Sequence, residues 1–471
     1  MAVDVHSAAD GRGSQSGSGT LPGREGAYLL TSRSDLAQFA RDAADCAMRA
    51  GAAQVIASAT EKAGVVMKAR SGAFESAVKE GAQSLSIRVF DAGRTATVST
   101  SALTPEAIRL AVERAMAIAG EVEPDLDAAP PESSWLARNG PSVELFSQSR
   151  FTPEDLGRTA LEIEAAVARH GGPTVRVAEA GAASVEYCFA LAIGRDFDRS
   201  DLASRHDIWC RAIAQRGNLL TQDWWSSSDR RPSQLLTPSA VGAMAADRAV
   251  RKLGGRTLET RTCPVLLDAV VASTLVDEVA AALSGRAQFQ QATFLAGGKG
   301  TQALADHLDL VEDPLEPFGL ASGAYDSEGV AGVPRHIIRE GMVEDYFLSC
   351  LYARKLGLRP TGNADGVRNL TLSSRRPRDT LAGLLRQMNR GLWVTELIGG
   401  AVDPVSGAYS KAAAGFWIEN GEVAFPVQDV TIAGELPAML AGIVAVGSDV
   451  HRRGAIRTGS IFIESMRISG R

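Results

Sequence analysis

The strongest constraint on the fold is an order of elements that occurs twice, each time closed by a similar helix. The two closing segments are LTPEAIRLAVERAMAIAG (residues 103–120) and LTPSAVGAMAADRAVRKLGG (residues 236–255). Both begin with Leu-Thr-Pro, which suits a helix N-cap followed by Pro in the first turn, and both end at Gly. We therefore expect two related helix–strands–helix modules. Chance similarity between two alanine-rich helices is the alternative.

The first module is predicted over residues 31–130. It opens with a helix that ends at Gly51 and contains a hairpin, SLSIRVFDAGRTATVST, which turns at Asp91-Ala92-Gly93. A central module over residues 131–258 repeats the order, with a helix near 153–169 before strands such as VEYCFALAIG and HDIWCRAIAQR. The stretch PDLDAAPPESSW between the modules has the composition of a linker.

A third, strand-rich domain is predicted over residues 259–471. The segment IIREGMVEDYFL predicts a hairpin about Glu340-Gly341, followed by a helical stretch to Gly357. A second hairpin is predicted in GFWIENGEVAFPV, where Asn420-Gly421 tolerates the positive φ of a tight turn. The expected fold class is thus α+β, with two related helix–strands–helix modules followed by a strand-rich C-terminal domain.

Composition excludes several classes of partner. The net charge of −6 gives no general attraction to nucleic acid or to anionic membrane, and pairs such as Arg230-Arg231 and Arg452-Arg453 are interpreted as solvated surface. The five cysteines are widely spaced and include no CxxC, which favours reduced thiols in a cytoplasmic protein. No segment approaches the ~18 apolar residues of a membrane span. Residues 1–30 are Gly/Ser-rich and predict a flexible tail rather than a signal peptide.

The residues alone predict no catalytic apparatus. None of the six histidines stands one helical turn from another, as a zinc site commonly requires. There is no Gly-x-Ser-x-Gly elbow, and GGKG at 297–300 lacks the rest of a phosphate-binding loop. Asp326 and Glu328 in AYDSEGV are the acidic pair of most interest, with an ordinary polar turn as the alternative.

The third domain resembles the TldD/PmbA family. The resemblance rests on AYDSEGVAGVPRHIIREGMVEDYFLSCLYARKLGLRPTGNA, on VDPVSGAYSKAAAGFWIENGEVAFPVQDVTIAG, and on the late MLAGIVAVGSD. Their order and spacing agree with the family's motifs over some two hundred residues. GAQSLSIRVF and the helix after LTPEA extend a weaker resemblance into the first module.

The resemblance implies one of two kinds of subunit. TldD-type chains carry a zinc-binding HExxxH helix and a late Cys ligand, whereas PmbA-type chains, also called TldE, lack these ligands and pair with TldD. Anchored on the Leu-x-Gly that closes LVDEVAAALSG, the HExxxH positions fall on Val276, Asp277 and Ala281, and no Cys follows Asp449. A register shifted by one would place Glu278 at the acid position, again without a histidine. We therefore expect no catalytic residue and no metal ligand in this chain.

The resemblance further implies a zinc-free subunit of a heteromeric TldD-like metalloprotease that degrades or trims unfolded peptides. Zinc would then reside in a TldD-type partner, this chain would complete the peptide cleft, and whether it is an enzyme in its own right stays open. The alternative is a non-proteolytic regulatory protein that modulates gyrase or a toxin by binding protein, without direct contact to nucleic acid or membrane. Expected cleft or interface residues are Asp326, Glu328, Tyr409, Ser410 and Trp417.

Overall fold

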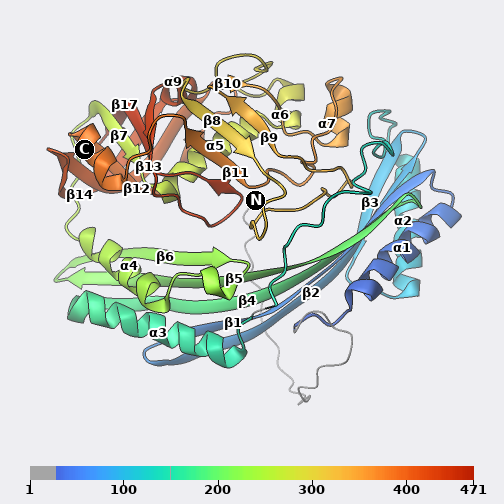
Figure 1. The fold of residues 1–471 in the computed structure, drawn as a ribbon, viewed down its shortest axis with the longest axis horizontal. Helices are drawn as coiled ribbons and strands as arrows, with labels where there is room; N and C mark the ends of the chain where they lie inside the picture. The colour runs from blue at the N-terminus through green and yellow to red at the C-terminus, as the bar shows by residue number, and fades with distance from the viewer. Residues whose placement is uncertain (1–27, 149, 471) are drawn as a thin grey trace.

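The computed structural model describes residues 28–148 and 150–470. Figure 1 shows one long curved sheet built by the first half of the chain, with helices on its outer face and the C-terminal domain facing its inner side. The fold is α+β, as predicted. None of the helices in these ranges is both long enough and apolar enough to cross a bilayer.

The first two modules have the predicted order of elements. The first consists of α1 (Arg33–Arg49), β1 (Gln54–Arg70), β2 (Ala73–Asp91), β3 (Arg94–Thr100) and α2 (Pro105–Glu121). The second consists of α3 (Pro153–Gly171), β4 (Val175–Ile193), β5 (Phe197–Arg216), β6 (Leu219–Asp229) and α4 (Pro238–Arg251). Thr104 and Thr237 cap α2 and α4 by accepting backbone N–H bonds, as the shared Leu-Thr-Pro predicts.

The two modules share a single antiparallel sheet, which the sequence analysis did not predict. Its strand order is β3-β2-β1-β4-β5-β6, so the first long strand of each module pairs at the centre. That pairing runs from Ile56 opposite Ile193 to Ala69 opposite Ala180. The boundary near residue 130 therefore separates two sequence units but not two sheets.

Small residues let the helices lie close to the sheet and to one another. Ala40, Ala43 and Ala47 of α1 are fully buried against the first module's strands. A Cβ placed on Gly242 of α4 would lie 2.4 Å from the carbonyl oxygen of Ile163 in α3, so only glycine permits that contact. The alanine-rich pattern thus reflects close packing.

Residues 28–30, predicted to belong to a flexible tail, are instead docked on the sheet. The backbone N–H groups of Leu30 and Thr31 donate to the buried Glu61 carboxylate at 2.6 and 2.9 Å, and Tyr28 N–H donates to Glu186 at 2.8 Å. The Leu29 side chain is only 3% exposed. Buried carboxylates need such donors, and the sequence gives no local sign of them. The rest of the predicted tail, residues 1–27, lies outside the described residues.

The segment between the modules is irregular, as predicted for a linker, but it is fixed to the C-terminal domain. Arg354 donates to the carbonyl oxygens of Asp127, Ala129 and Pro130, and Lys355 Nζ lies 2.8 Å from Asp125. Arg230, interpreted above as solvated, is 7% exposed and donates to carbonyl oxygens of both halves of the chain, including Ser204 and Gly319. These arginines hold the two halves together.

The C-terminal domain contains two sheets around a central helix, α5 (Ala269–Ala282). One sheet has the order β10-β9-β8-β11-β16 and the other β14-β13-β12-β7-β17-β15. The strands are β7 (Arg261–Leu267), β8 (Leu308–Glu312), β9 (Arg335–Arg339), β10 (Met342–Val343), β11 (Leu370–Ser374), β12 (Gly391–Val402), β13 (Ala408–Glu419), β14 (Glu422–Glu435), β15 (Ile443–Val446), β16 (Ile456–Arg457) and β17 (Ile461–Ser469). The further helices are α6 (Gly285–Gln290), α7 (Cys350–Lys355), α8 (Leu381–Met388) and α9 (Leu436–Ala441).

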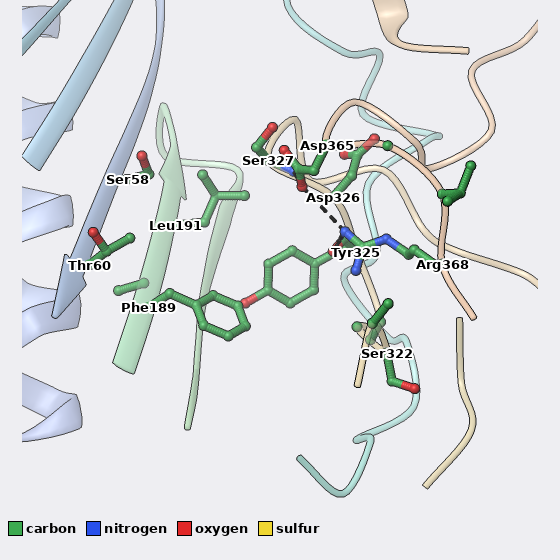
Figure 2. A pocket seen from close by; sticks show the side chains of 16 residues that line it. Ser58, Thr60, Phe189, Leu191, Ser322, Tyr325, Asp326, Ser327, Asp365 and Arg368 are labelled. Carbon is green, nitrogen blue, oxygen red and sulfur yellow. Dashed lines mark hydrogen bonds and ion pairs between the residues drawn. The ribbon is translucent and has the colours of Figure 1, made fainter. Parts of the chain in front are cut away.

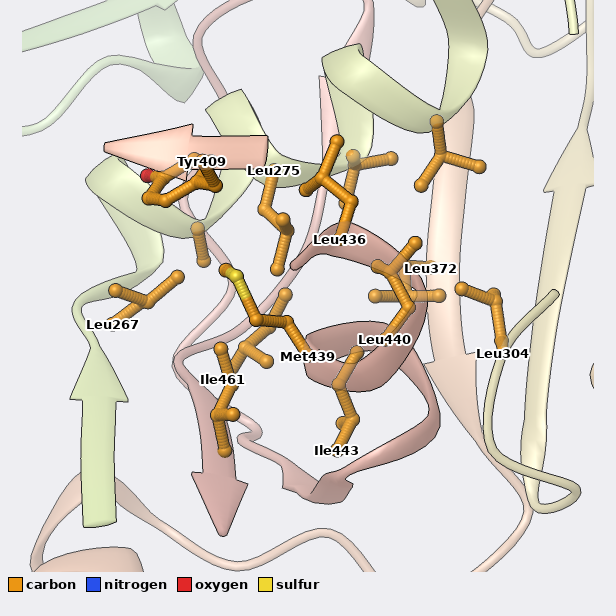
Figure 3. Close-up of a cluster of buried hydrophobic side chains, with 14 of the residues drawn as sticks. Leu267, Leu275, Leu304, Leu372, Tyr409, Leu436, Met439, Leu440, Ile443 and Ile461 are labelled. Carbon is orange, nitrogen blue, oxygen red and sulfur yellow. The ribbon is translucent and has the colours of Figure 1, made fainter. Parts of the chain in front are cut away.

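Both predicted hairpins of this domain are confirmed. β9 and β10 turn at Glu340-Gly341, and β13 and β14 turn at Asn420-Gly421; all four turn residues have positive φ. Figure 3 shows the domain core, where Leu275 of α5 packs with Leu436, Met439 and Leu440 of α9.

Candidate functional site

Four hollows lie along the junction between the N-terminal sheet and the C-terminal domain. Their volumes are about 430, 620, 340 and 320 Å³, and three of them take wall residues from both halves of the chain. Neighbouring hollows share walls: Val367 lines three of them, Asp277 lines two, and Ala364 lines two. The four hollows are therefore neighbours, and together they are here called the interdomain groove. A groove between two packed layers is a common setting for ligand binding.

Helix α5, which carries the stretch LVDEVAAALSG, contributes one face to the core and the other to this groove. Asp268 caps its N-terminus by accepting the Val270 N–H at 3.2 Å. Val276 is 3% exposed and packs in the domain core, whereas Asp277 and Ala281 are exposed and line the groove. The helix is thus both a packing helix and a wall of the candidate site.

The three positions implied by the family resemblance do not fit a zinc ion. Val276 and Ala281 carry no lone pair, and Val276 points away from the groove into apolar surroundings. Asp277 is the single carboxylate of the three, and one carboxylate does not provide the three protein ligands of a catalytic zinc site. No chemical step is assigned to a metal held by these positions.

Asp277 and Glu278 have different surroundings although they are adjacent. Glu278 lies 3.9 Å from Lys411 and is half-buried; burial raises its pKa, the Lys411 ammonium lowers it, and Asp277 raises it. Asp277 instead faces the groove. Glu278 therefore forms an ion pair on the β13 side of the helix, whereas the carboxylate of Asp277 faces the groove.

The largest hollow lies against the first half of α5 and is here called the α5 pocket. It has a volume of about 620 Å³, and its polar wall includes Asp223, Arg248, Asp277, Thr395, His451 and Arg453. Arg248 Nε lies 3.2 Å from Asp223, and Lys252 Nζ lies 2.9 Å from Asp223 and 2.6 Å from Glu396. These short ion pairs fix α4 against β6 and β12.

Two polar atoms of residues on the wall of the α5 pocket have no hydrogen-bond partner within residues 28–148 and 150–470. They are Thr395 Oγ1 and His451 Nε2, and the Thr395 side chain is 5% exposed. Thr395 is the extra residue of a bulge in β12, where the pairing with β13 shifts between Val394 and Glu396. Burial, together with the charges of Arg453 and Arg248, lowers the pKa of His451 to about 4, so its imidazole is neutral at pH 7.

A second hollow, the Tyr325 pocket, has a volume of about 430 Å³. Figure 2 shows Ser58, Thr60, Phe189 and Leu191 on strands β1 and β4 opposite the loop that carries Tyr325, Asp326 and Ser327. The Tyr325 hydroxyl donates to Asp201 at 2.9 Å across this boundary, and Arg368 donates to the Tyr325 carbonyl at 3.0 Å. The loop is therefore held against the sheet.

Asp326 and Glu328, the acidic pair singled out from the sequence, both lie on the groove wall. Asp326 is 2% exposed and accepts N–H bonds from Glu328, Val330 and Ala364 at 2.9–3.0 Å. Burial raises its pKa to about 7, against the lowering effect of the Ala364 N–H and with a further rise from Glu328. Glu328 pairs with Arg88 of β2 at 3.2 Å and accepts the Cys350 N–H at 2.7 Å. Both acids are occupied in holding the turn.

Tyr409, Ser410 and Trp417, which were expected in the cleft or at an interface, line none of the four hollows. Tyr409 and Trp417 are each 3% exposed and belong to the core of the C-terminal domain. They lie at odd positions of β13, which face the core, while Ser410 lies on the exposed side of the same strand and lines none of the four hollows. Large aromatic residues in a strand give the same sequence signal in a core as in a cleft.

Apart from Asp277, the polar residues that line the α5 pocket were not identified as site residues from the sequence, and Arg453 was interpreted as solvated surface. Arg248 lies on α4, Thr395 on β12, and His451 and Arg453 on the segment after β15. They are separated by up to two hundred positions and have no shared spacing. Only the docking of the C-terminal domain on the first sheet brings them together.

Two solved structures share the fold of this chain over nearly its whole length. A putative modulator of DNA gyrase from Bacteroides thetaiotaomicron superposes with a TM-score of 0.85 at 22% identity, over 94% of this chain and 100% of that one. TldE from Thermococcus kodakarensis superposes with a TM-score of 0.79 at 17% identity, over 93% of this chain and 100% of that one. At these identities the likeness concerns the fold.

Sequence comparison establishes the family. Residues 260–470 match the PmbA/TldA metallopeptidase C-terminal domain, and residues 56–119 match domain 1 of the same family. Metalloprotease PmbA of Escherichia coli O157:H7 is 34% identical over 86% of this chain and 90% of its own length. The PmbA homologue of Haemophilus influenzae is 33% identical over 94% and 98%. The chain belongs to the TldD/PmbA family of metallopeptidases, and these relatives are of the PmbA type.

Proposed function

We propose that this chain is the zinc-free subunit of a heteromeric TldD-like metalloprotease and that its interdomain groove holds unfolded peptide. One observation carries the proposal: α5 lines an open groove, yet its three motif positions offer a valine, an aspartate and an alanine. The chain therefore has an open groove beside α5 but lacks metal-ligating side chains at the motif positions. A peptidase that acts without a partner would need both the groove and the ligands.

The groove supplies features that suit an extended chain. β6 is an edge strand of the N-terminal sheet, and its residues Asp223 and Trp224 line the α5 pocket. A peptide that pairs with an edge gains backbone hydrogen bonds without a demand on its sequence. Zinc, held in the partner, would supply activation of water and polarisation of the scissile carbonyl. The residues of this chain then bind and orient the peptide.

A cytoplasmic location completes the proposal. Cys46, Cys210, Cys263 and Cys350 are free thiols, and Cys210 and Cys350 are buried. Burial raises the pKa of Cys210 to about 12, so this thiol stays protonated and unreactive. Such thiols suit a reducing compartment.

Co-expression with a TldD-type homologue tests the proposal directly. The two chains are expected to co-purify, with one zinc per complex that is lost when the partner's HExxxH histidines are replaced. The complex should hydrolyse an unfolded peptide, and neither chain alone should do so. Stoichiometric zinc bound by this chain alone after mild chelation contradicts the proposal. A stable complex with no hydrolysis of any peptide favours the regulatory alternative.

A further inference from the structure

The α5 pocket presents one cation and one anion that have no partner of opposite sign. Within residues 28–148 and 150–470, neither Arg453 nor Asp277 is recorded in an ion pair, although both line this pocket. The other charges of the wall are matched, because Asp223 is shared by Arg248 and Lys252, and Glu396 is held by Lys252. A pocket that leaves one charge of each sign unmatched favours a ligand that carries both signs.

Arg453 stacks on an aromatic ring of the pocket wall and makes no ion pair within the described residues. Its guanidinium carbon lies 4.3 Å from the centre of the Trp224 ring, a stacking contact that leaves its planar N–H donors available. A guanidinium with free donors binds a carboxylate through two parallel hydrogen bonds. The Trp224 contact therefore prepares Arg453 for an anionic group that is not part of this chain.

The unpartnered atoms of the pocket wall point to the same conclusion independently. Thr395 lines the pocket and is 5% exposed, and its hydroxyl has no hydrogen-bond partner among the described residues. The neutral His451 ring also leaves Nε2 without a partner. Buried polar groups are rarely left unsatisfied, so a pocket with two such atoms is suited to a ligand with its own hydrogen-bonding groups.

We infer that the α5 pocket binds the zwitterionic ends of a short peptide, with the free carboxylate on Arg453 and the free ammonium on Asp277. Thr395 and His451 belong to the wall of the same pocket. The volume of about 620 Å³ lies within the range of ordinary small-ligand sites. This inference rests on the proposed function, because it names the form of peptide that the groove holds: short chains with free ends, as released by proteolysis.

Binding of capped and uncapped tri-alanine to the full chain, measured by calorimetry, tests the inference. Removal of the C-terminal charge by amidation, or of the N-terminal charge by acetylation, should each weaken binding by about tenfold, the worth of one charge-assisted contact. In Arg453→Gln the free and amidated peptides should bind alike, and in Asp277→Asn the free and acetylated peptides should bind alike.

Two neighbours provide matched controls. Arg452→Gln removes a positive charge next to Arg453, and Glu278→Gln removes a negative charge next to Asp277. Neither Arg452 nor Glu278 lines the pocket. Both should retain the full dependence on free ends. A doubly capped peptide with Glu in place of the central Ala tests whether Arg453 binds a side-chain carboxylate instead. If this peptide binds more tightly than doubly capped tri-alanine, the assignment of Arg453 to the C-terminal carboxylate is overturned.

The outcomes separate this inference from the proposed function. In one outcome a doubly capped unfolded dodecapeptide binds, while tri-alanine binds weakly or equally well with capped and free ends. That outcome supports the proposed function and overturns the inference. In the other outcome tri-alanine binds only with free ends and the dodecapeptide does not bind, which supports the inference and overturns the proposed function. Equal loss in the Arg452 and Arg453 variants would also overturn the inference, since it would reduce the effect to net charge.

Discussion

Arg88 of β2 and Glu328 of the C-terminal domain form an ion pair with 3.2 Å between Nη1 and Oε1, and this pair spans the boundary between the two halves of the chain. The Glu328 side chain is 9% exposed, and its other oxygen accepts the Cys350 N–H. Glu328 of the AYDSEGV turn therefore links the C-terminal domain to the N-terminal sheet.

The first prediction concerns this pair. Arg88→Met should lower the free energy of unfolding by about 3 kcal/mol, because it leaves a buried carboxylate without its cation. The double variant with Glu328→Gln should recover part of the loss. The exposed pair Arg109–Glu113 is the matched control, and Arg109→Met should cost less than about 1 kcal/mol. Urea unfolding measures all of these, and equal costs at the two sites would refute the prediction.

The second prediction separates the docked residues from those before them. Deletion of residues 1–26 should leave the melting temperature unchanged, because their Gly/Ser-rich sequence offers little apolar surface to bury. Deletion of residues 1–31 should lower it by several degrees, because it removes both N–H donors from the Glu61 carboxylate and uncovers the site of Leu29. Calorimetry of the two truncations checks this. Identical melting curves would show that the docked segment contributes nothing.

The third prediction concerns the β13–β14 turn. Gly421 has φ of +76°, and a Cβ there would lie 2.9 Å from Arg386 Cα. Gly421→Ala should therefore destabilise the C-terminal domain by about 1–2 kcal/mol or more. Gly120→Ala in α2, where a Cβ meets nothing within 4 Å, should be neutral or slightly stabilising. A Gly421 variant with unaltered thermal unfolding would mean that the turn relaxes freely.

The fourth prediction concerns pH. His206 is 1% exposed, neither ring nitrogen has a partner, and burial lowers its pKa from 6.5 to about 4. The unfolded state binds this proton near pH 6.5 and the folded state does not, so stability is lost as the pH falls from 6.5 toward 4. The loss attributable to His206 is on the order of 3 kcal/mol at pH 4.

His206→Leu checks that assignment, because leucine stays neutral at every pH. The variant should show a flatter decline of unfolding free energy between pH 6.5 and 4 than the parent. Comparison of the two proteins at pH 7.5 gives the packing cost of the substitution by itself. Parallel pH curves would show that other groups cause the decline.

The fifth prediction concerns catalysis in the assembled pair. Asp277→Asn combined with Glu278→Gln should change peptide hydrolysis at saturating peptide by no more than several-fold, because neither acid is expected to act on the partner's zinc-bound water. Replacement of the glutamate in the partner's HExxxH should abolish hydrolysis, as loss of a general base costs ~10²–10⁴-fold or more. Binding between the subunits must be measured for the double variant. If it assembles normally and is as inactive as the partner variant, then α5 belongs to the active site.

Local patterns in the sequence predicted the elements well. Thr-Pro helix starts, the alternating strands and the Asn420-Gly421 turn are decided by neighbouring residues, and the structure contains them all. Tyr409 and Trp417 lie in the core of the C-terminal domain, and a strand pattern alone does not tell a core-facing aromatic residue from one that faces a cleft. The α5 pocket could not be predicted, since Arg248 and Arg453 meet only through tertiary docking.

The pairing of β1 with β4 has a consequence for the history of the chain. Each module leaves the long edge of its first strand open until the other module covers it, from Ile56 opposite Ile193 to Ala69 opposite Ala180. A single module would expose that edge to self-association. If the modules descend from one ancestor, the same edge in that ancestor was available to pair with a second copy of the molecule. Gene duplication would then have converted an intermolecular strand pairing into the intramolecular pairing of β1 with β4.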